Sequence, residues 1–169
     1  MNNSRFYAAG LKFSCKRCSS CCRYESGYVY LSEKDLEKLM SALKMDRKEF
    51  ITAYCRWVNG WDGDEVLSLK EKINKDCILW ENGCAVYEAR PLQCVTYPFW
   101  ENIIATSRSW ETAALACPGM NTGELHTERA INDTVKIRVS SPVISKSAET
   151  FGSDSQKGEL TAGKAGREK

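Results

Sequence analysis

The stretch Cys15-Lys16-Arg17-Cys18-Ser19-Ser20-Cys21-Cys22 places four thiols within eight residues, and the interpretation of the whole chain starts from it. Thiols this numerous and this close together are not ordinary core packing. Five more cysteines bring the total to nine: Cys55, Cys77, Cys84, Cys94 and Cys117. The pattern predicts a protein that binds a metal ion or a metal cluster.

The composition is that of a small folded protein. The chain has 169 residues, of which 43% are hydrophobic, and its formal net charge is +2. This is enough for one domain with a core, and the near-neutral charge gives no reason to expect nucleic acid or a membrane as partner. The cysteine-rich domain is predicted to cover 1–145. Residues 146–169 are rich in Ser, Gly, Lys, Glu and Thr and are predicted to form a disordered tail.

The cysteines are expected to be reduced thiols. No apolar run of signal-peptide length is present, since Lys12 interrupts the segment Tyr7–Phe13, and no run of about 20 apolar residues predicts a membrane span. We therefore expect a cytoplasmic protein, in which dense cysteines indicate metal binding or catalysis rather than disulfides. The odd number of cysteines and the adjacency of Cys21 and Cys22 favour the same interpretation.

Local signals predict an α+β fold, a small metal-stabilised domain with short helices and a β-hairpin. Capping-box patterns at Ser32 and at Asp46 start two helices, the second running to about Tyr54. Period and turn signals predict the other elements: strands at 27–31, 65–69 and 103–106, a hairpin over 77–87 with a two-residue Asn82-Gly83 turn, a helical turn from Pro91, and a final helix over 122–139.

The donor set points to soft metals. A C-x-x-C pair lets two thiolates converge on one ion, and the single histidine, His126, lies outside every cysteine cluster and is expected to be a solvated helix residue. All-thiolate sites suit zinc or an iron–sulfur cluster such as 4Fe–4S. The C-x-x-C-x-x-C spacing and the Cys117-Pro118 pair resemble cubane ligation, although a turn proline is common.

Basic residues flank the cysteines and are candidates to offset the charge of a thiolate centre. These residues are Lys16, Arg17, Arg23 and Arg90. Arg90 is the best candidate, because it lies between Cys84 and Cys94, whereas Lys16 and Arg17 are equally well explained as solvated surface residues.

The spacing also suggests how the cysteines are grouped. The side chains of Cys21 and Cys22 are expected to diverge, so that Cys15, Cys18 and Cys21 serve one centre and Cys22 another, unless the two centres lie close together. A regular hairpin would separate Cys77 from Cys84 by roughly 13 Å, at about 3.4 Å per residue, so these two are not expected to share one mononuclear site. Cys55 ends an amphipathic segment and is expected to be a core residue.

The motifs resemble a known family when they are taken in order. They are Phe13-x-Cys15-x-x-Cys18-x-x-Cys21-Cys22, Val29-x-Leu31, Cys77-x-Leu79, Gly83-Cys84-x-Val86-Tyr87-Glu88-x-Arg90-Pro91-x-x-Cys94, Tyr97-Pro98-Phe99 and Cys117-Pro118-Gly119. Over 13–119 the chain resembles the CxxCxxCC cysteine-cluster family (YkgJ-like), described as zinc- or iron-chelating.

The resemblance implies eight metal ligands: Cys15, Cys18, Cys21, Cys22, Cys77, Cys84, Cys94 and Cys117. One departure is Val95, where the family usually has arginine after the cysteine, so no role is assigned to a basic side chain there.

Three functions remain open from the sequence. The first is a metal-binding module with one or two all-thiolate centres, structural or electron-carrying, that meets a protein partner or an electron donor. The second is an enzyme that uses the centre for redox or protein methyl-transfer chemistry. A flagellin lysine-N-methylase carries a similar cysteine motif, although this chain shows no catalytic motif besides its cysteines. The third and least favoured is an adaptor with exposed tryptophans.

Overall fold

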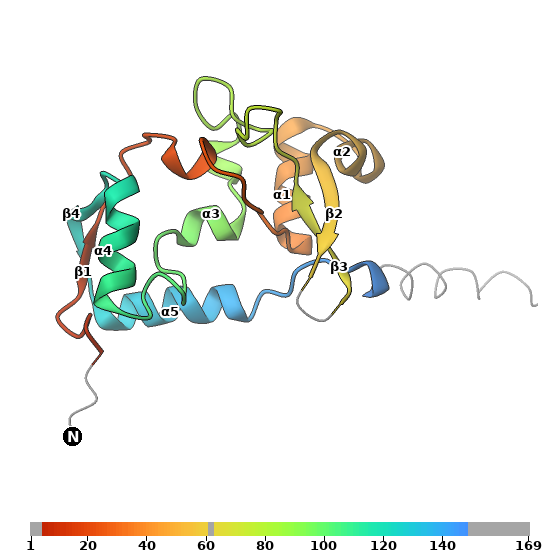
Figure 1. Ribbon diagram of the computed structural model, residues 1–169. Coiled ribbons are helices and arrows are strands. Elements are labelled where there is room, and N and C mark those ends of the chain that lie inside the picture. The colour runs from red at the N-terminus through yellow and green to blue at the C-terminus, as the bar shows by residue number, and fades with distance from the viewer. Residues whose placement is uncertain (1–4, 61–62, 149–169) are drawn as a thin grey trace, which may run out of the picture.

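A computed structural model describes residues 5–60 and 63–148. The helices and strands gather around two separate hydrophobic cores, which form two halves of the molecule. Figure 1 shows α1, α2, β2 and β3 on one side and β1, β4 and α4 on the other, with α3 between them and α5 running beneath. The observed fold is therefore α+β, as predicted.

The first half begins with two capped helices. Helix α1 (Glu33–Leu43) starts at Ser32, whose hydroxyl accepts a hydrogen bond from the Asp35 amide, while the Asp35 carboxylate accepts one from the Ser32 amide. Helix α2 (Arg47–Tyr54) has the same arrangement between Asp46 and Glu49. Such reciprocal caps satisfy amides that the first helical turn leaves without partners, so both helix starts follow from local sequence.

A two-stranded antiparallel sheet continues directly from α2. Strand β2 (Cys55–Asn59) pairs with β3 (Glu65–Leu69) in a register that places Cys55 opposite Leu69. The chain on either side of Leu31 runs along β3, with the Leu31 amide donating to Leu67 O at 3.1 Å. The buried core of this half consists of Leu31, Leu36, Leu39, Phe50, Cys55, Leu67, Leu69, Leu79, Val86 and Ile144.

The second half is built on pairing between the two ends of the cysteine-bearing segment. Strand β1 (Leu11–Phe13) pairs antiparallel with β4 (Met120–His126), and α4 (Ser107–Ala116) and α5 (Glu128–Val139) pack nearby. The buried core of this half consists of Tyr7, Phe99, Ile104, Trp110, Met120 and Ile131.

Several short segments connect the halves. The 3₁₀ turn η1 (Ser20–Cys22) lies on the stretch that crosses from β1 to α1 (Figure 1), and η2 (Tyr87–Ala89) leads into α3 (Leu92–Thr96), which packs against α5. The cysteine run therefore bridges the two halves. Within the described residues, no helix is long and apolar enough to cross a membrane.

Four predicted elements are wrong. The 27–31 segment is not a regular strand: it has only an isolated bridge, between Tyr30 and Ser68, beside β3. The 77–87 segment is not a regular hairpin: it has an isolated bridge between Trp80 and Cys84, around a three-residue loop, while Cys77 bridges to Glu71 and its amide donates to Cys22 O. Residues 103–106 form turns, in which the amides of Ile103 and Ile104 both donate to Trp100 O.

The predicted 122–139 helix starts only at Glu128, since the residues before it pair with β1. In the predicted tail, residues 146–148 are helical and 149–169 lie outside the described residues, so the domain boundary stays a prediction.

Candidate metal centre

All eight cysteines that the sequence singles out line one cavity of about 300 Å³. They come from four separate stretches of the chain: the cysteine run, the loop before η2, helix α3 and the end of α4. Cys55, the ninth, is not among the lining residues. The fold thus gathers at one place the thiols that the sequence spreads over about a hundred residues.

Local backbone geometry turns the cysteine run around the cavity. Arg17 and Ser19 adopt positive φ angles of 53° and 65°, which reverse the chain between successive cysteines. The Arg17 amide lies 3.4 Å from Cys15 Sγ and donates to it. An amide that donates to a thiolate sulfur orients it and lowers its charge, as is typical of cysteines that bind metals.

Cys21 and Cys22 converge rather than diverge. Their sulfurs lie 3.8 Å apart, because the η1 turn brings the two side chains to the same side. A hydrogen bond from the Cys22 thiol, opposed by burial, lowers the pKa of Cys21 to about 7, and the same contact raises the pKa of Cys22. The expectation of divergent side chains is therefore wrong, and a thiolate forms more readily at Cys21 than at Cys22.

Cys77 and Cys84 come from the first half, and Cys94 comes from α3, which lies between the halves. The Cys77 amide donates to Cys22 O at 2.7 Å, and the Trp80–Cys84 bridge folds the intervening loop back so that Cys84 reaches the same cavity. The straight-hairpin argument for a separation of roughly 13 Å does not hold, because the segment is bent. Burial raises the pKa of the Cys94 thiol and of the Cys77 thiol.

The second half supplies Cys15 and Cys117. The Ser14 amide donates to Gly119 O at 3.1 Å, so the chain just before Cys15 runs beside the turn that follows Cys117. A Cβ at Gly119 would stand 2.5 Å from Ser14 O, so only glycine permits this close approach. Tyr97 lies against this group, and burial together with its contact with Cys117 raises the pKa of its phenol.

Two arginines and a tyrosine form a positively charged part of the lining. The guanidinium carbons of Arg17 and Arg90 lie 3.9 and 3.7 Å from the centroid of the Tyr87 ring, and Arg90 Nε also donates to Tyr87 O at 2.8 Å. Both cations are therefore within the range of an attractive contact with the ring. Arg90 lowers the thiol pKa at Cys21 as a minor cause, after the hydrogen bond from Cys22.

The remaining flanking residues divide between the cavity and the first half. Lys16 also lines the cavity. Arg23 instead points to the first half, where its Nε donates to Asp76 at 3.1 Å and its guanidinium covers Trp80. Tyr87 and Tyr97 were not predicted from the sequence as site residues. The Tyr87-x-x-Arg90 spacing could have indicated Tyr87, because it allows the arginine to pack on the tyrosine ring.

Two candidate donors lie outside the cavity. Cys55 is 5% exposed within the first core, and burial raises its pKa to about 12. His126 is on strand β4, where Nε2 lies 3.0 Å from Phe13 O and its ring packs on Phe13 and Phe99. The prediction that His126 lies on a helix is therefore wrong, since it lies on a strand. Neither residue lines the cysteine cavity.

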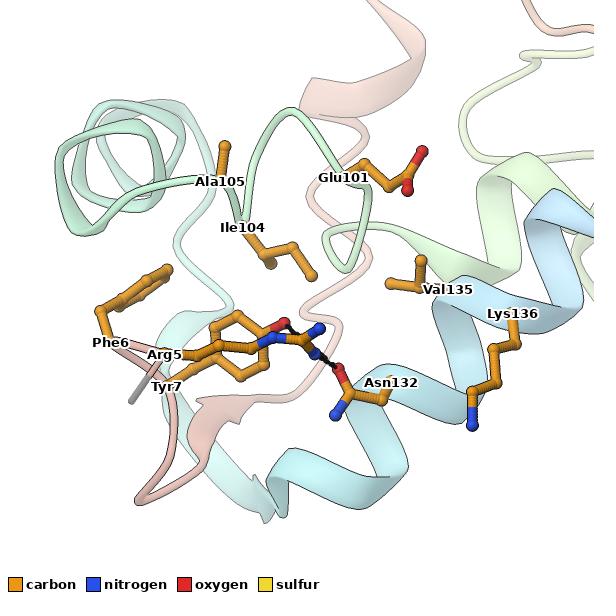
Figure 2. Close-up of a pocket in the computed structure, with 9 residues that line it drawn as sticks. All are labelled: Arg5, Phe6, Tyr7, Glu101, Ile104, Ala105, Asn132, Val135 and Lys136. Carbon is orange, nitrogen blue, oxygen red and sulfur yellow. Dashed lines mark hydrogen bonds between the residues drawn. The ribbon is translucent and has the colours of Figure 1, made fainter. Parts of the chain in front are cut away.

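A larger cavity of about 580 Å³ lies away from the cysteines, beside the N-terminal turn and α5 (Figure 2). Three of its polar side chains bond to one another: Arg5 donates to Tyr7 and to Asn132, and the Tyr7 hydroxyl donates to Asn132 at 3.2 Å. No cysteine or histidine lines it. Its residues offer no soft donor, so the chemistry of this protein is expected at the cysteine cavity.

The thiol donors of the cysteine cavity fit zinc or iron in their chemistry, but most of them must come closer together to bind one ion. Thiolates bind zinc at about 2.3 Å, which places neighbouring sulfurs roughly 3.8 Å apart, the separation of Cys21 and Cys22. Among the described residues, no three Cys, His, Asp or Glu side chains stand close enough together to hold one ion. A four-thiolate ion therefore needs other thiols to move inward when it binds.

Comparison with known proteins agrees with this site. The family model CxxCxxCC, described as a "Putative zinc- or iron-chelating domain", matches residues 14–118, more than half of the chain. A protein of Methanocaldococcus jannaschii, "Uncharacterized protein MJ0661", is 31% identical over 96 residues, which cover 55% of this chain and 48% of the relative. The chain thus spans about half the length of that curated relative. No solved structure matches.

The stretch that matches the family model contains each of the eight cysteines that line the cavity. The resemblance inferred from the ordered motifs is confirmed: the chain belongs to the CxxCxxCC family of zinc- or iron-chelating domains.

Proposed function

We propose that this protein binds zinc or an iron–sulfur cluster through Cys15, Cys18, Cys21, Cys22, Cys77, Cys84, Cys94 and Cys117. The observation that carries the proposal is that one cavity collects these eight thiols and leaves out the ninth. Thiolate donors favour zinc and iron–sulfur centres over magnesium and calcium. The proposal includes a reducing compartment such as the cytoplasm, because the thiols must stay free to bind.

The charges around the cavity support a thiolate centre. Four thiolates around a zinc ion, or around a cubane of charge 2+, leave about −2 by formal counting. Lys16, Arg17 and Arg90 line the cavity and offset this charge. In this chain the cysteines hold the metal, the Arg17 amide orients Cys15, and the Tyr87 ring holds both guanidiniums in place. An iron–sulfur cluster bound here would supply one-electron transfer, and zinc would supply a structural cross-link.

The test is anaerobic purification of the full chain followed by iron, sulfide and zinc assays. A brown protein with equal iron and sulfide supports the cluster, and a colourless protein with zinc supports the structural ion. Cys55→Ala is the matched control, because it removes a thiol that does not line the cavity. Metal content that falls as much in Cys55→Ala as in Cys94→Ala would contradict the ligand assignment, and no metal in the parent protein would contradict the function.

An enzymatic role is the second candidate, and one observation favours it. A second cavity of about 340 Å³ shares Cys21, Cys22, Cys77 and Cys94 with the cysteine cavity. A small molecule in this space would touch the thiol wall, as redox or methyl-transfer chemistry at the centre requires. Steady reduction of a small acceptor by the metal-loaded protein with an added electron donor, or its methylation with an added sulfonium methyl donor that is converted to the thioether, would show an enzyme. Loss of this turnover in Cys94→Ala would distinguish it from a passive metal-binding module.

A further inference from the structure

The eight cysteines are not spread evenly around their cavity, because each half of the molecule holds its own set. Cys77 and Cys84 pack against the first core, and Cys117 packs against the second. The cysteine run is the stretch that passes from one half to the other (Figure 1). Backbone hydrogen bonds and electrostatic interactions of the thiols separate them into two groups of four.

The first group is Cys22, Cys77, Cys84 and Cys94. Cys22 is tied to Cys77 by the 2.7 Å bond from the Cys77 amide to Cys22 O. The sulfur of Cys22 interacts electrostatically with those of Cys77 and Cys94, and Cys94 in turn with those of Cys77 and Cys84. Cys21 also interacts with Cys77 and Cys94, so it stands at the boundary of this set. The four thiols thus form one connected set on the side of the first core.

The second group is Cys15, Cys18, Cys21 and Cys117. The hydroxyl of Tyr97 contacts Cys117 and interacts electrostatically with Cys21 and Cys18, so these three sulfurs lie near one phenol. Cys15 joins them through the backbone bond between Ser14 and Gly119, which holds the start of the run beside the turn after Cys117. This set lies on the side of the second core, to which Cys117 belongs.

The two groups meet at the adjacent pair Cys21–Cys22. Their sulfurs are 3.8 Å apart, which is the edge of a tetrahedron of thiolates around one zinc ion, at about 2.3 Å per bond. That distance also suits a single ion, so the division of the pair rests on their neighbours: of the two sulfurs, Cys21 is the one that interacts with Tyr97. The other thiols must move inward on binding, because among the described residues no three donors stand close enough to hold one ion. Charge also favours division, since eight thiolates on one ion would leave a large uncompensated negative charge.

We propose that the cavity holds two adjacent four-thiolate centres, one formed by Cys22, Cys77, Cys84 and Cys94 and the other by Cys15, Cys18, Cys21 and Cys117. The proposal rests on the proposed metal-binding function and adds the number of centres and the ligands of each. Each centre joins the cysteine run to one core, so the pair of centres fastens the two halves together through the run. Filling one centre does not require the ligands of the other.

The experiment is a titration of the metal-free, reduced full chain with Co²⁺ in the absence of air, followed by thiolate-to-cobalt absorption. The parent protein and the Cys55→Ala control are expected to saturate at two equivalents. Cys84→Ser and Cys117→Ser are each expected to saturate at one all-thiolate equivalent, and the double variant is expected to lose this absorption. A loss of both equivalents in either folded single variant, or one equivalent in the parent, would overturn the two-centre proposal.

A second measurement does not depend on the folding of any variant. Cadmium NMR of the parent chain loaded with isotopically enriched Cd²⁺ is expected to give two separate signals in the all-thiolate range. A single such signal at saturation would refute two centres while leaving metal binding intact. A parent protein that takes up neither Co²⁺, Cd²⁺, zinc nor iron would instead refute the proposed function.

Discussion

The nine cysteines differ in what surrounds each thiol, and this difference decides which of them can react. Cys21 has its pKa lowered by a neighbouring thiol, whereas burial raises the pKa of Cys55 to about 12 from its ordinary value of 9.0. A thiolate is the form that binds metals and reacts with electrophiles. Sequence alone ranked Cys55 as a core residue from its place at a helix end, and its position in the first core agrees with that prediction.

Cys55 is predicted to resist alkylation in the folded protein and to make stability depend on pH in alkaline solution. Because its folded pKa is raised, the buried neutral thiol stabilises the fold fully below the unfolded pKa, and this contribution is lost as pH rises from about 9 toward 12. Mass spectrometry after iodoacetamide treatment checks the first point. Denaturant unfolding of the parent and Cys55→Ala between pH 8 and about 11 checks the second, and a pH dependence that is identical in both would contradict it.

Arg90 is predicted to strengthen metal binding through charge rather than by direct ligation. Its guanidinium lines the cavity and is held on the Tyr87 ring, so Arg90→Gln should weaken zinc affinity by about 10-fold, as is common when a group behind a ligand is lost. Competition with a chromophoric chelator measures this affinity. Arg129→Gln is the control, since that arginine is exposed on α5. Equal zinc affinity in the two variants would contradict a role for Arg90 in metal binding.

At the scale of elements, one buried carboxylate joins the first helix to a helix that carries a cysteine. Asp35 Oδ2 accepts from the Ser32 amide and hydroxyl, and Oδ1 accepts from the Leu92 amide at 2.7 Å. Asp35→Ala should lower the free energy of unfolding by about 2–4 kcal/mol, because it leaves buried donors without partners at the start of both helices. Glu33→Ala, which removes an exposed ion pair with Arg47, should cost under about 1 kcal/mol. Denaturant titration of both variants measures the difference, and similar losses would contradict this role.

Local sequence signals predicted the helices whose capping bonds lie within a few residues. They failed for segments whose structure depends on pairing with a distant part of the chain. The caps at Ser32 and Asp46 are complete within four residues, so both helices were predictable. Strand β4 exists because β1 pairs with it, and Gly123 adopts a positive φ of 79° where a Cβ would collide with Ser14. The sequence of 122–126 carries no sign of that partner, which lies more than a hundred residues earlier.

The same distinction applies to the candidate site. The motif pattern named the eight cysteines, and the structure places all of them on one cavity, although nothing in their spacing shows that the chain bends at Trp80–Cys84. The convergence of Cys21 and Cys22 was also missed, because it depends on the left-handed conformation of Ser19 before the η1 turn. Serine rarely adopts that conformation, so a serine in the sequence does not predict it.

At the scale of the whole molecule, the two halves are joined by the cysteine run and by α3 against α5. A metal that binds only the folded chain adds about 2.7 kcal/mol of stability per site when its concentration is 100 times the dissociation constant. Chelation is therefore predicted to lower the melting temperature by several degrees or more. Re-addition of zinc to the chelated protein should restore it, and no change on either step would contradict a structural role for the metal.

Hydrogen exchange should show where that stability acts. The amides of the cysteine run hold few backbone bonds of their own, so 14–22 should lose most protection when metal is removed, together with the segments that carry the distant cysteines. Helix α1 is capped and packed in the first core, so its protection should change least. Mass-spectrometric exchange of the loaded and chelated protein compares these segments directly. Uniform loss of protection would mean that both halves unfold together when the metal is removed. Loss confined to the cysteine run and the segments with the other cysteines would show that the metal links two halves whose cores remain folded without it.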